Sequence, residues 1–152
     1  MGLIINQPSE VSARELLTHL EMPWNGAATE MVWSGGPVNP NTGWVLHEPS
    51  LALNEFAKGG ALDVAPGIVL TNSPDRLRHI AGAPPAYFRI LLGYAGWGPG
   101  QLAAEMASGA WLHAEADPAI VFRTPAAKMW EAALRSVGIS PDSVAAGGRG
   151  MN

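Results

Sequence analysis

The segment Leu91-Leu92-Gly93-Tyr94-Ala95-Gly96-Trp97-Gly98-Pro99-Gly100-Gln101-Leu102 is the most distinctive stretch of this sequence. Alternating apolar residues predict a strand over 87–94. Four glycines follow, and 99–108 is then typical of a helix with Leu102, Ala103 and Met106 facing inward and Gly109 as its cap. Glycines let a backbone approach a ligand, and a helix start offers free N–H groups to an anion. The loop 93–100 is therefore a candidate ligand-binding loop, with Gly96 and Gly98 as its central residues.

This loop fits neither standard phosphate-binding fingerprint. It lacks the G-x-G-x-x-G spacing, and no Lys-Ser/Thr pair follows it. Trp97 also fills space that a phosphate would need. A tight strand-to-helix turn, in which Trp97 and Tyr94 pack as plugs, is the favoured interpretation.

Two other segments resemble anion-binding turns. Thr71-Asn72-Ser73 precedes a predicted helix, so Thr71 and Ser73 lie where free N–H groups meet a ligand. Ser34-Gly35-Gly36-Pro37 is the other, although it resembles an ordinary turn equally well. With two polar side chains at predicted strand ends, the candidate ligand-binding residues are Asn6, Gly36, His47, Thr71, Ser73, Gly96 and Gly98.

No catalytic or metal-binding arrangement is predicted. The four histidines share no metal-ligand spacing, and no G-x-S-x-G elbow occurs. His47 beside Glu48, and His113 near Glu115 and Asp117, are pairs of a kind that arises often by chance. We therefore expect no catalytic residue, no metal and no cofactor, and a protein that is not an enzyme.

Composition limits the compartment and the partners. Hydrophobic residues make up 47% and charged residues 14% of the 152 residues, which is typical of a globular protein with a packed core. Cysteine is absent, so a reducing cytoplasm is expected. No run of residues is long and apolar enough for a membrane span. The net charge is −4 and the basic residues are scattered, which disfavours direct nucleic-acid binding. The small cluster at Arg76, Arg78 and His79 is interpreted as a solvated helix face.

The order of elements predicts an α+β fold. Strands are expected over 3–5, 31–33, 44–47, 61–64, 68–71, 87–94, 111–113 and 120–122, with helices over 12–21, 73–81, 99–108 and 125–137. Residues 39–43 are expected to form a turn, 6–9 a strand break, and Leu51, Leu53 and Phe56 a weak strand. Ser12 and Ser73 are the expected helix caps. The prediction is a single domain, with a mixed, largely antiparallel sheet and helices packed against it.

Several motifs together resemble one bacterial family. They are Gly2-Leu3-Ile4-Ile5-Asn6-Gln7-Pro8, Gly35-Gly36-Pro37-Val38, Gly43-Trp44-Val45-Leu46-His47, Leu70-Thr71-Asn72-Ser73-Pro74-Asp75, the stretch 92–102, Trp111-Leu112 and Phe122-x-Thr124-Pro125. In this order they resemble the YqgE/AlgH family over nearly the whole chain. The Gly-Tyr-Ala-Gly-Trp-Gly-x-Gly-Gln-Leu motif is the most specific of them.

The resemblance implies a bent sheet curling into a pseudo-barrel, and a cytoplasmic bacterial protein. It implies no settled activity: the AlgH name comes from a proposed role in transcriptional regulation of alginate synthesis. The family offers no agreed catalytic residues to carry over to this sequence.

The chain departs from the family at its start, because members carry a further strand, loop and strand before the Gly-Leu-Ile-Ile-Asn motif. We therefore expect a domain over 1–146 that lacks these N-terminal strands, and a flexible tail over 147–152. Strand edges exposed in this way favour self-association.

The expected function is non-enzymatic binding or regulation through a protein partner, as for a transcriptional regulator. The alternative is a small-ligand or anion-binding protein, or an enzyme, that uses the loop 93–100. One open pocket shared by Asn6, Gly36, Thr71 and Gly96 would favour this alternative. It fails if these residues lie far apart or if Trp97 and Trp44 fill the space between them.

Overall fold

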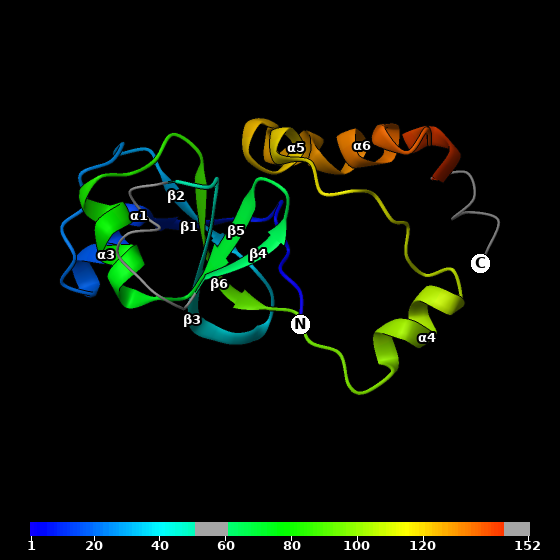
Figure 1. The fold of residues 1–152 in the computed structure, drawn as a ribbon, viewed down its shortest axis with the longest axis horizontal. Helices are drawn as coiled ribbons and strands as arrows, with labels where there is room; N and C mark the ends of the chain where they lie inside the picture. Colours follow the sequence, from blue (N-terminus) through cyan, green and yellow to red (C-terminus); the bar gives the residue numbers. More distant parts are fainter. Residues whose placement is uncertain (51–60, 145–152) are drawn as a thin grey trace. The chain divides into compact units, whose positions relative to one another are not determined.

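The computed structural model describes residues 1–50 and 61–144. It contains two compact units, Met1–Gly96 and Trp97–Asn152, and each is considered by itself. Strands belong to the first unit, and α4, α5 and α6 belong to the second (Figure 1). The single domain over 1–146 stays a prediction. The weak strand expected at Leu51, Leu53 and Phe56 and the tail 147–152 lie outside the described residues.

The first unit is built on one six-stranded sheet with the order β1-β2-β6-β3-β5-β4. The strands are β1 (Pro8–Ser12), β2 (Met31–Ser34), β3 (Val38–His47), β4 (Ala61–Ala65), β5 (Ile68–Thr71) and β6 (Phe88–Tyr94). Only the β2–β6 pair is parallel, and the other neighbours are antiparallel. The predicted α+β class with a mixed, mostly antiparallel sheet is therefore confirmed. The described strands form an open order with β1 and β4 at its edges, so the sheet is not a closed barrel.

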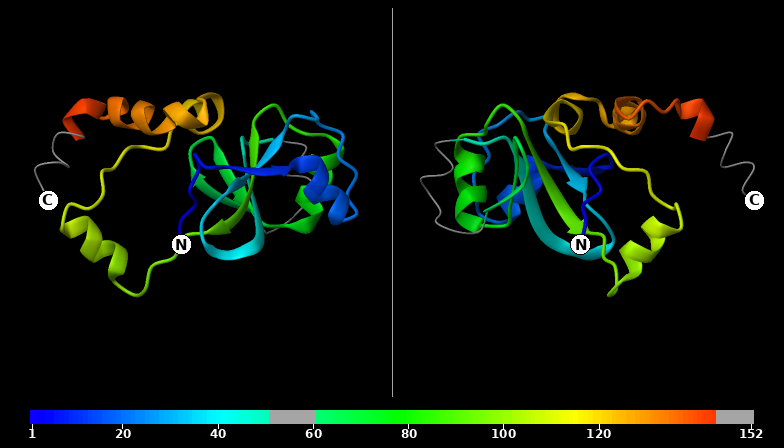
Figure 2. Two further views of the ribbon diagram at one scale, coloured as in Figure 1. Left: turned by 180° about the vertical axis from the view of Figure 1, so that it is seen from behind. Right: turned by 45° about the vertical axis from the view of Figure 1, so that its right-hand side comes forward.

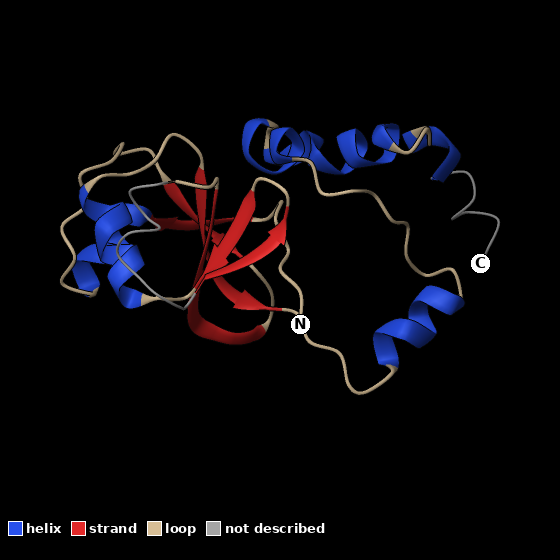
Figure 3. Cartoon of the chain, viewed as in Figure 1, coloured by secondary structure: helices blue, strands red, loops and turns tan. Residues whose placement is uncertain are grey.

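Two helices of the first unit begin where the sequence predicts. In α1 (Ala13–His19), Ser12 Oγ accepts a hydrogen bond of 3.0 Å from the Glu15 N–H. In α3 (Pro74–Gly82), Ser73 Oγ accepts a longer bond of 3.4 Å from the Arg76 N–H, and Pro74 occupies the first turn. Each cap satisfies an N–H group that has no partner inside its helix. Figure 3 shows these two helices beside the strands of the first unit.

One residue of the expected solvated face of α3 is buried. Arg76 is 3% exposed, because it lies one turn before the buried Ile80 on the helix face that packs on the sheet, whereas Arg78 is exposed. The prediction of a solvated face is therefore wrong for Arg76.

The core lies between these helices and one face of the sheet. Leu17 of α1 and Ile80 of α3 have no exposed surface, and they pack in one cluster with Val45, Phe88 and Ile90. Val45 pairs with Ile90 across the β3–β6 ladder, so both side chains point to the same face. Figures 1 and 2 show α1 and α3 side by side over this face.

Residues 39–43 do not form the predicted turn, because β3 runs through them. The β3–β6 register shifts between the pairs Val38–Tyr94 and Gly43–Leu92, which is an irregularity of the bulge type. Asn39 has a φ of 45°, and its amide donates a 3.1 Å hydrogen bond to the Tyr94 hydroxyl. The turn-forming residues thus bend a strand without ending it, and Figure 1 shows the curved β3.

The predicted strand over 3–5 and the break over 6–9 are also wrong. Strand β1 begins at Pro8, inside the expected break, and pairs with β2. The preceding segment makes only isolated bonds: Gly2 exchanges two with Ala95, and the Ile4 N–H donates to the Gly35 carbonyl at 2.8 Å. Its backbone groups find partners in loops and not in a ladder, which periodicity cannot predict.

The second unit is helical in its described part. It contains α4 (Gln101–Ala107), α5 (Pro118–Arg123) and α6 (Ala126–Ser136), and a further helical turn over 141–144. Helices α5 and α6 contact each other. Helix α6 confirms the prediction for 125–137.

Three predictions for the second unit are wrong. Residues 120–122 lie in α5 and not in a strand, because Asp117 caps the helix start by accepting from the Ala119 N–H at 2.9 Å. Residues 111–113 form no strand, and Trp111 is 44% exposed. Helix α4 buries none of its residues, so the inward face expected at Leu102, Ala103 and Met106 is absent.

Candidate functional site

The glycine motifs of the first unit meet at a backbone junction. The Gly35 N–H donates to the Leu92 carbonyl at 2.7 Å. A Cβ on Gly36 would overlap the Tyr94 backbone, and one on Gly93 would overlap the Gly36 carbonyl oxygen. Gly93 also has a φ of 76°, which side chains rarely adopt. Gly36 therefore allows close packing of two backbone segments and leaves no room for a ligand between them.

The glycines of the loop 93–100 have different surroundings. Gly96 is exposed at the end of the first unit, and a Cβ there would meet only a Val38 methyl group, at 3.8 Å. Gly98 is exposed in the second unit, and its N–H donates to Gln101 Oε1 at 3.0 Å. This amide is therefore already satisfied within its own unit, and an anion would have to displace Gln101.

A carboxylate organises two tryptophans in the second unit. Glu105 accepts hydrogen bonds from Trp111 Nε1 at 2.8 Å, Gln101 Nε2 at 3.0 Å and Trp97 Nε1 at 3.2 Å. The indole rings of Trp97 and Trp111 meet edge to face with centroids 5.7 Å apart. The bonds from Trp111 and Gln101 stabilise the carboxylate and lower the pKa of Glu105. Trp97 therefore packs against the indole of Trp111 within the second unit.

Thr71 and Ser73 line a largely apolar pocket of the first unit, which we call the α1–α3 pocket. It encloses about 260 Å³ between α1, the start of α3 and the sheet face that these helices cover. Apolar side chains form most of its wall: Leu16, Leu20, Met22, Val45, Leu77, Ile90 and Leu92. Asn41, Gly43, Trp44, Asn72 and Pro74 complete the described lining.

The polar end of the α1–α3 pocket is the turn that starts α3. Thr71 is 1% exposed, and its Oγ1 accepts from the Ser73 N–H at 3.2 Å. Ser73 in turn caps α3 through the Arg76 N–H. Both hydroxyl oxygens therefore accept hydrogen bonds from backbone N–H groups and stabilise the turn that precedes α3.

His47 lies on the same sheet face but does not line the pocket. It is fully buried and pairs with Val69 of β5 and Phe88 of β6. Its Nδ1 lies 2.7 Å from the Glu48 carbonyl oxygen, which only accepts, so Nδ1 carries the proton. Nε2 has no hydrogen-bond partner among the described residues. Burial lowers the pKa of His47, and the charge of Arg76 lowers it further although the Glu48 bond opposes this. The side chain is therefore a buried neutral imidazole.

The seven predicted ligand-binding residues are not brought to one place. Thr71 and Ser73 share the α1–α3 pocket, whereas Asn6 is exposed before β1 and does not line it. Gly36 lies at the backbone junction and His47 in the core. Asn6, Gly36 and Gly96 do not join Thr71 around the pocket, so the criterion for a ligand site shared with the loop 93–100 is not met. Ligand binding by the individual residues stays a prediction.

Sequence patterns did not identify most of the pocket wall. The helical spacing of Leu16, Leu17 and Leu20 showed that α1 packs on the sheet, but not that a gap remains beside Leu16 and Leu20. Among the described residues, no three His, Asp or Glu side chains are grouped closely enough to hold a metal ion. In the same part of the chain no helix has the length and apolarity needed to cross a membrane.

The chain is similar to known proteins over most of its length. Residues 1–142 match a family model described as AlgH-like. A UPF0301 protein from Ruegeria pomeroyi is 45% identical over 142 residues, covering 91% of this chain and 75% of that protein. A UPF0301 protein from Bordetella avium is 39% identical over 144 residues, covering 93% of this chain and 70% of that one.

Two solved structures have a fold similar to that of this chain. The AlgH protein from Pseudomonas aeruginosa has a TM-score of 0.73 and 35% identity, covering 96% of this chain and 76% of that chain. A protein from Corynebacterium diphtheriae has a TM-score of 0.67 over 88% of this chain and 68% of that chain. At 21% identity, the second similarity concerns the fold alone.

Proposed function

We propose that this chain, which belongs to the AlgH-like family, is a non-enzymatic protein that binds a small molecule in the α1–α3 pocket and serves a regulatory role. The observation that carries the proposal is the pocket itself. It combines about 260 Å³ of space, a mostly apolar wall and a polar end at Thr71 and Ser73. Concave apolar pockets with a few convergent polar groups are the usual form of small-molecule sites.

The same lining argues against catalysis. General acid–base chemistry needs a titratable group within hydrogen-bond reach of the reacting atom. None of the described lining residues is ionisable. His47, the nearest buried base on this sheet face, is held by the Glu48 carbonyl and does not line the pocket. A binding role therefore fits this arrangement better than an enzymatic one.

Transcriptional regulation belongs to the proposal as a consequence of ligand binding, and not of direct contact with DNA. The net charge of −4 and the scattered basic residues do not favour a phosphate-binding surface. A cytoplasmic location, expected from the absence of cysteine, is part of the same proposal.

A matched pair of glycine substitutions tests the proposal. Gly43 lines the pocket, and a Cβ added there makes only an ordinary contact of 3.9 Å with Leu92. Gly43→Leu therefore directs a side chain into the pocket without backbone overlap. Gly82→Leu makes the same chemical change at the end of α3, where a Cβ meets nothing within 4 Å.

The measurement is a thermal-shift screen of small apolar compounds against the full chain, since a ligand that binds the folded state raises the melting temperature. Compounds that stabilise the wild type should also stabilise Gly82→Leu, and should lose their effect on Gly43→Leu. Equal shifts in all three proteins would place binding outside the pocket and contradict the proposal.

A second candidate function is association with a protein through the second unit. Trp111, Leu112 and Trp130 are 44%, 55% and 51% exposed, and they line a groove of about 560 Å³ beside α6. Exposed tryptophans are common anchors of protein interfaces. Self-association is the directly testable form: sedimentation should show a concentration-dependent dimer that Trp130→Ser weakens, and a monomer at all concentrations would contradict it.

A further inference from the structure

The charge of the α1–α3 pocket limits what it can hold. Its described wall contains apolar side chains, an indole, two amides and two hydroxyls, and no Asp, Glu, Lys, Arg or His. An ion that leaves water for such a site loses its hydration, and the described wall offers it no counter-charge. We propose that the ligand is an uncharged apolar molecule with one hydroxyl or carbonyl group, an inference that rests on the proposed function.

The start of α3 could be regarded as an exception, since helix N-termini attract anions. Three features of this helix oppose that. Pro74 has no N–H to offer, Ser73 Oγ already accepts from the Arg76 N–H, and Asp75 places a carboxylate in the first turn. Asp75 opposes a second negative charge at this end, and the buried cation of the same turn, Arg76, is not among the residues that line the pocket. A hydroxyl or carbonyl group meets no such repulsion beside the Thr71–Ser73 turn.

The volume sets the size of the molecule. An apolar cavity of about 150 Å³ accepts benzene, which has six non-hydrogen atoms. In proportion, the pocket volume of about 260 Å³ corresponds to about ten non-hydrogen atoms. An aromatic ring with a short chain ending in an alcohol has this size. A nucleotide or a sugar phosphate carries a charge that the described wall does not compensate.

Three probes with one carbon skeleton separate charge from shape. They are 3-phenylpropan-1-ol, 3-phenylpropanoate and 3-phenylpropylammonium, which are neutral, anionic and cationic at neutral pH. Calorimetric titration of the full chain gives the dissociation constant of each probe. NMR shifts of the Leu77 and Leu92 amides then report whether binding occurs in the pocket.

The alcohol should bind at least about tenfold more tightly than either ion, a difference of about 1.4 kcal/mol. Gly43→Leu should abolish its binding, and Gly82→Leu should preserve it. If the carboxylate or the amine binds as tightly as the alcohol, and Gly43→Leu removes that binding, the neutral-ligand inference is wrong while the pocket remains a ligand site. If none of the three probes shifts the pocket amides, the proposed function fails as well.

Discussion

The backbones of Gly36 and Gly93 approach so closely that the Gly36 carbonyl oxygen occupies the space a Cβ on Gly93 would need. This contact joins the loop after β2 to the end of β6. It gives the Gly-Gly-Pro and Gly-Tyr-Ala-Gly-Trp motifs a shared structural role. Gly36 and Gly93 therefore serve the packing of the first unit.

Gly93→Ala should destabilise the first unit by at least about 2 kcal/mol, because it adds left-handed backbone strain to a steric overlap. Gly82→Ala is the matched control. A Cβ there meets nothing within 4 Å, so its effect should lie between neutral and a gain of about 1 kcal/mol. Urea unfolding followed by circular dichroism measures both. Similar stabilities for the two variants would mean that the junction is not tight.

Leu17→Ala should cost about 2–5 kcal/mol of unfolding free energy, because Leu17 is fully buried in the core beneath α1. Leu20, at the end of the same helix, is 43% exposed. Leu20→Ala should therefore cost much less. Urea unfolding of the two variants checks the ranking, and a reversed order would contradict the orientation of α1.

His47 should make stability fall on mild acidification. An unfolded histidine titrates near pH 6.5, whereas burial lowers the pKa of His47 in the folded chain. Below pH 6.5 the unfolded chain takes up a proton that the folded chain does not, so the free energy of unfolding falls as the pH drops towards the lower folded pKa. The slope attributable to one proton is at most about 1.4 kcal/mol per pH unit.

His47→Leu, which removes the titrating group from an apolar site, should flatten this part of the pH profile. Urea unfolding at several pH values between 5 and 7.5 measures it in the wild type and the variant. An unchanged slope in the variant would show that another group governs the acid loss of stability.

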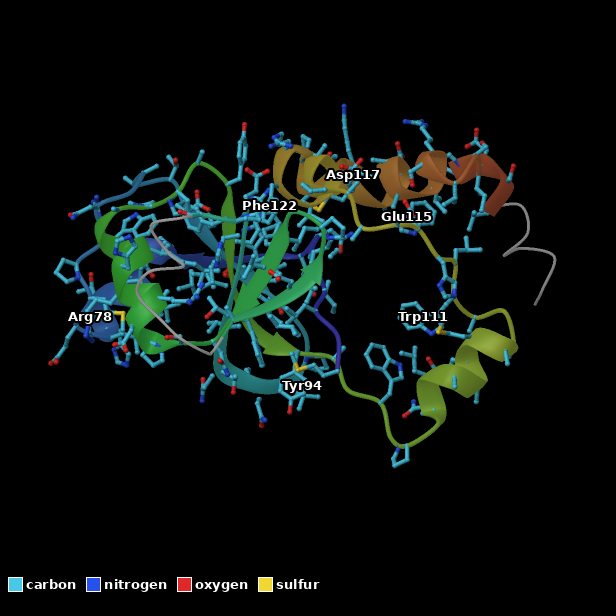
Figure 4. The ribbon with its side chains drawn as sticks, in the orientation of Figure 1. Arg78, Tyr94, Trp111, Glu115, Asp117 and Phe122 are labelled. Atoms are coloured by element: carbon cyan, nitrogen blue, oxygen red, sulfur yellow. The ribbon has the colours of Figure 1, made fainter. Side chains whose placement is uncertain are left out.

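Glu105→Ala should release the indoles of Trp97 and Trp111, because this carboxylate accepts both of their N–H groups. Their indole N–H resonances in NMR spectra, assigned through Trp→Phe variants, should exchange faster with solvent and shift upfield. Glu115→Ala changes an exposed carboxylate in the same unit and is the control (Figure 4). Unaltered exchange in Glu105→Ala would exclude the carboxylate as the organising group.

The candidate site could be predicted only in part. The helix start at Ser73-Pro74 is a local signal, so it placed Thr71 and Ser73 correctly at the mouth of α3. The pocket beside them could not be predicted, since it is the space that the side chains of α1, α3 and three strands leave unfilled where these elements pack together. The glycine-rich loops predicted Gly36 and Gly96 as ligand-binding residues. A glycine is required at position 36 because a Cβ there would overlap the Tyr94 backbone.

Elements whose signals are local could be predicted from the sequence alone. Capping serines mark the starts of α1 and α3, alternation marks β6, and Pro66-Gly67 separates the two runs that form β4 and β5. Such signals depend only on neighbouring residues. Tertiary structure decided the rest. Residues 39–43 became part of a bent strand because β6 pairs with Val38 before them and with Gly43 at their end. Leu3-Ile4-Ile5 remained outside a ladder because the hydrogen-bond partner of Ile4 lies in a loop. A backbone N–H or carbonyl group pairs with whichever acceptor or donor the fold brings within about 3 Å. In this protein such partners belong to segments that are distant in sequence.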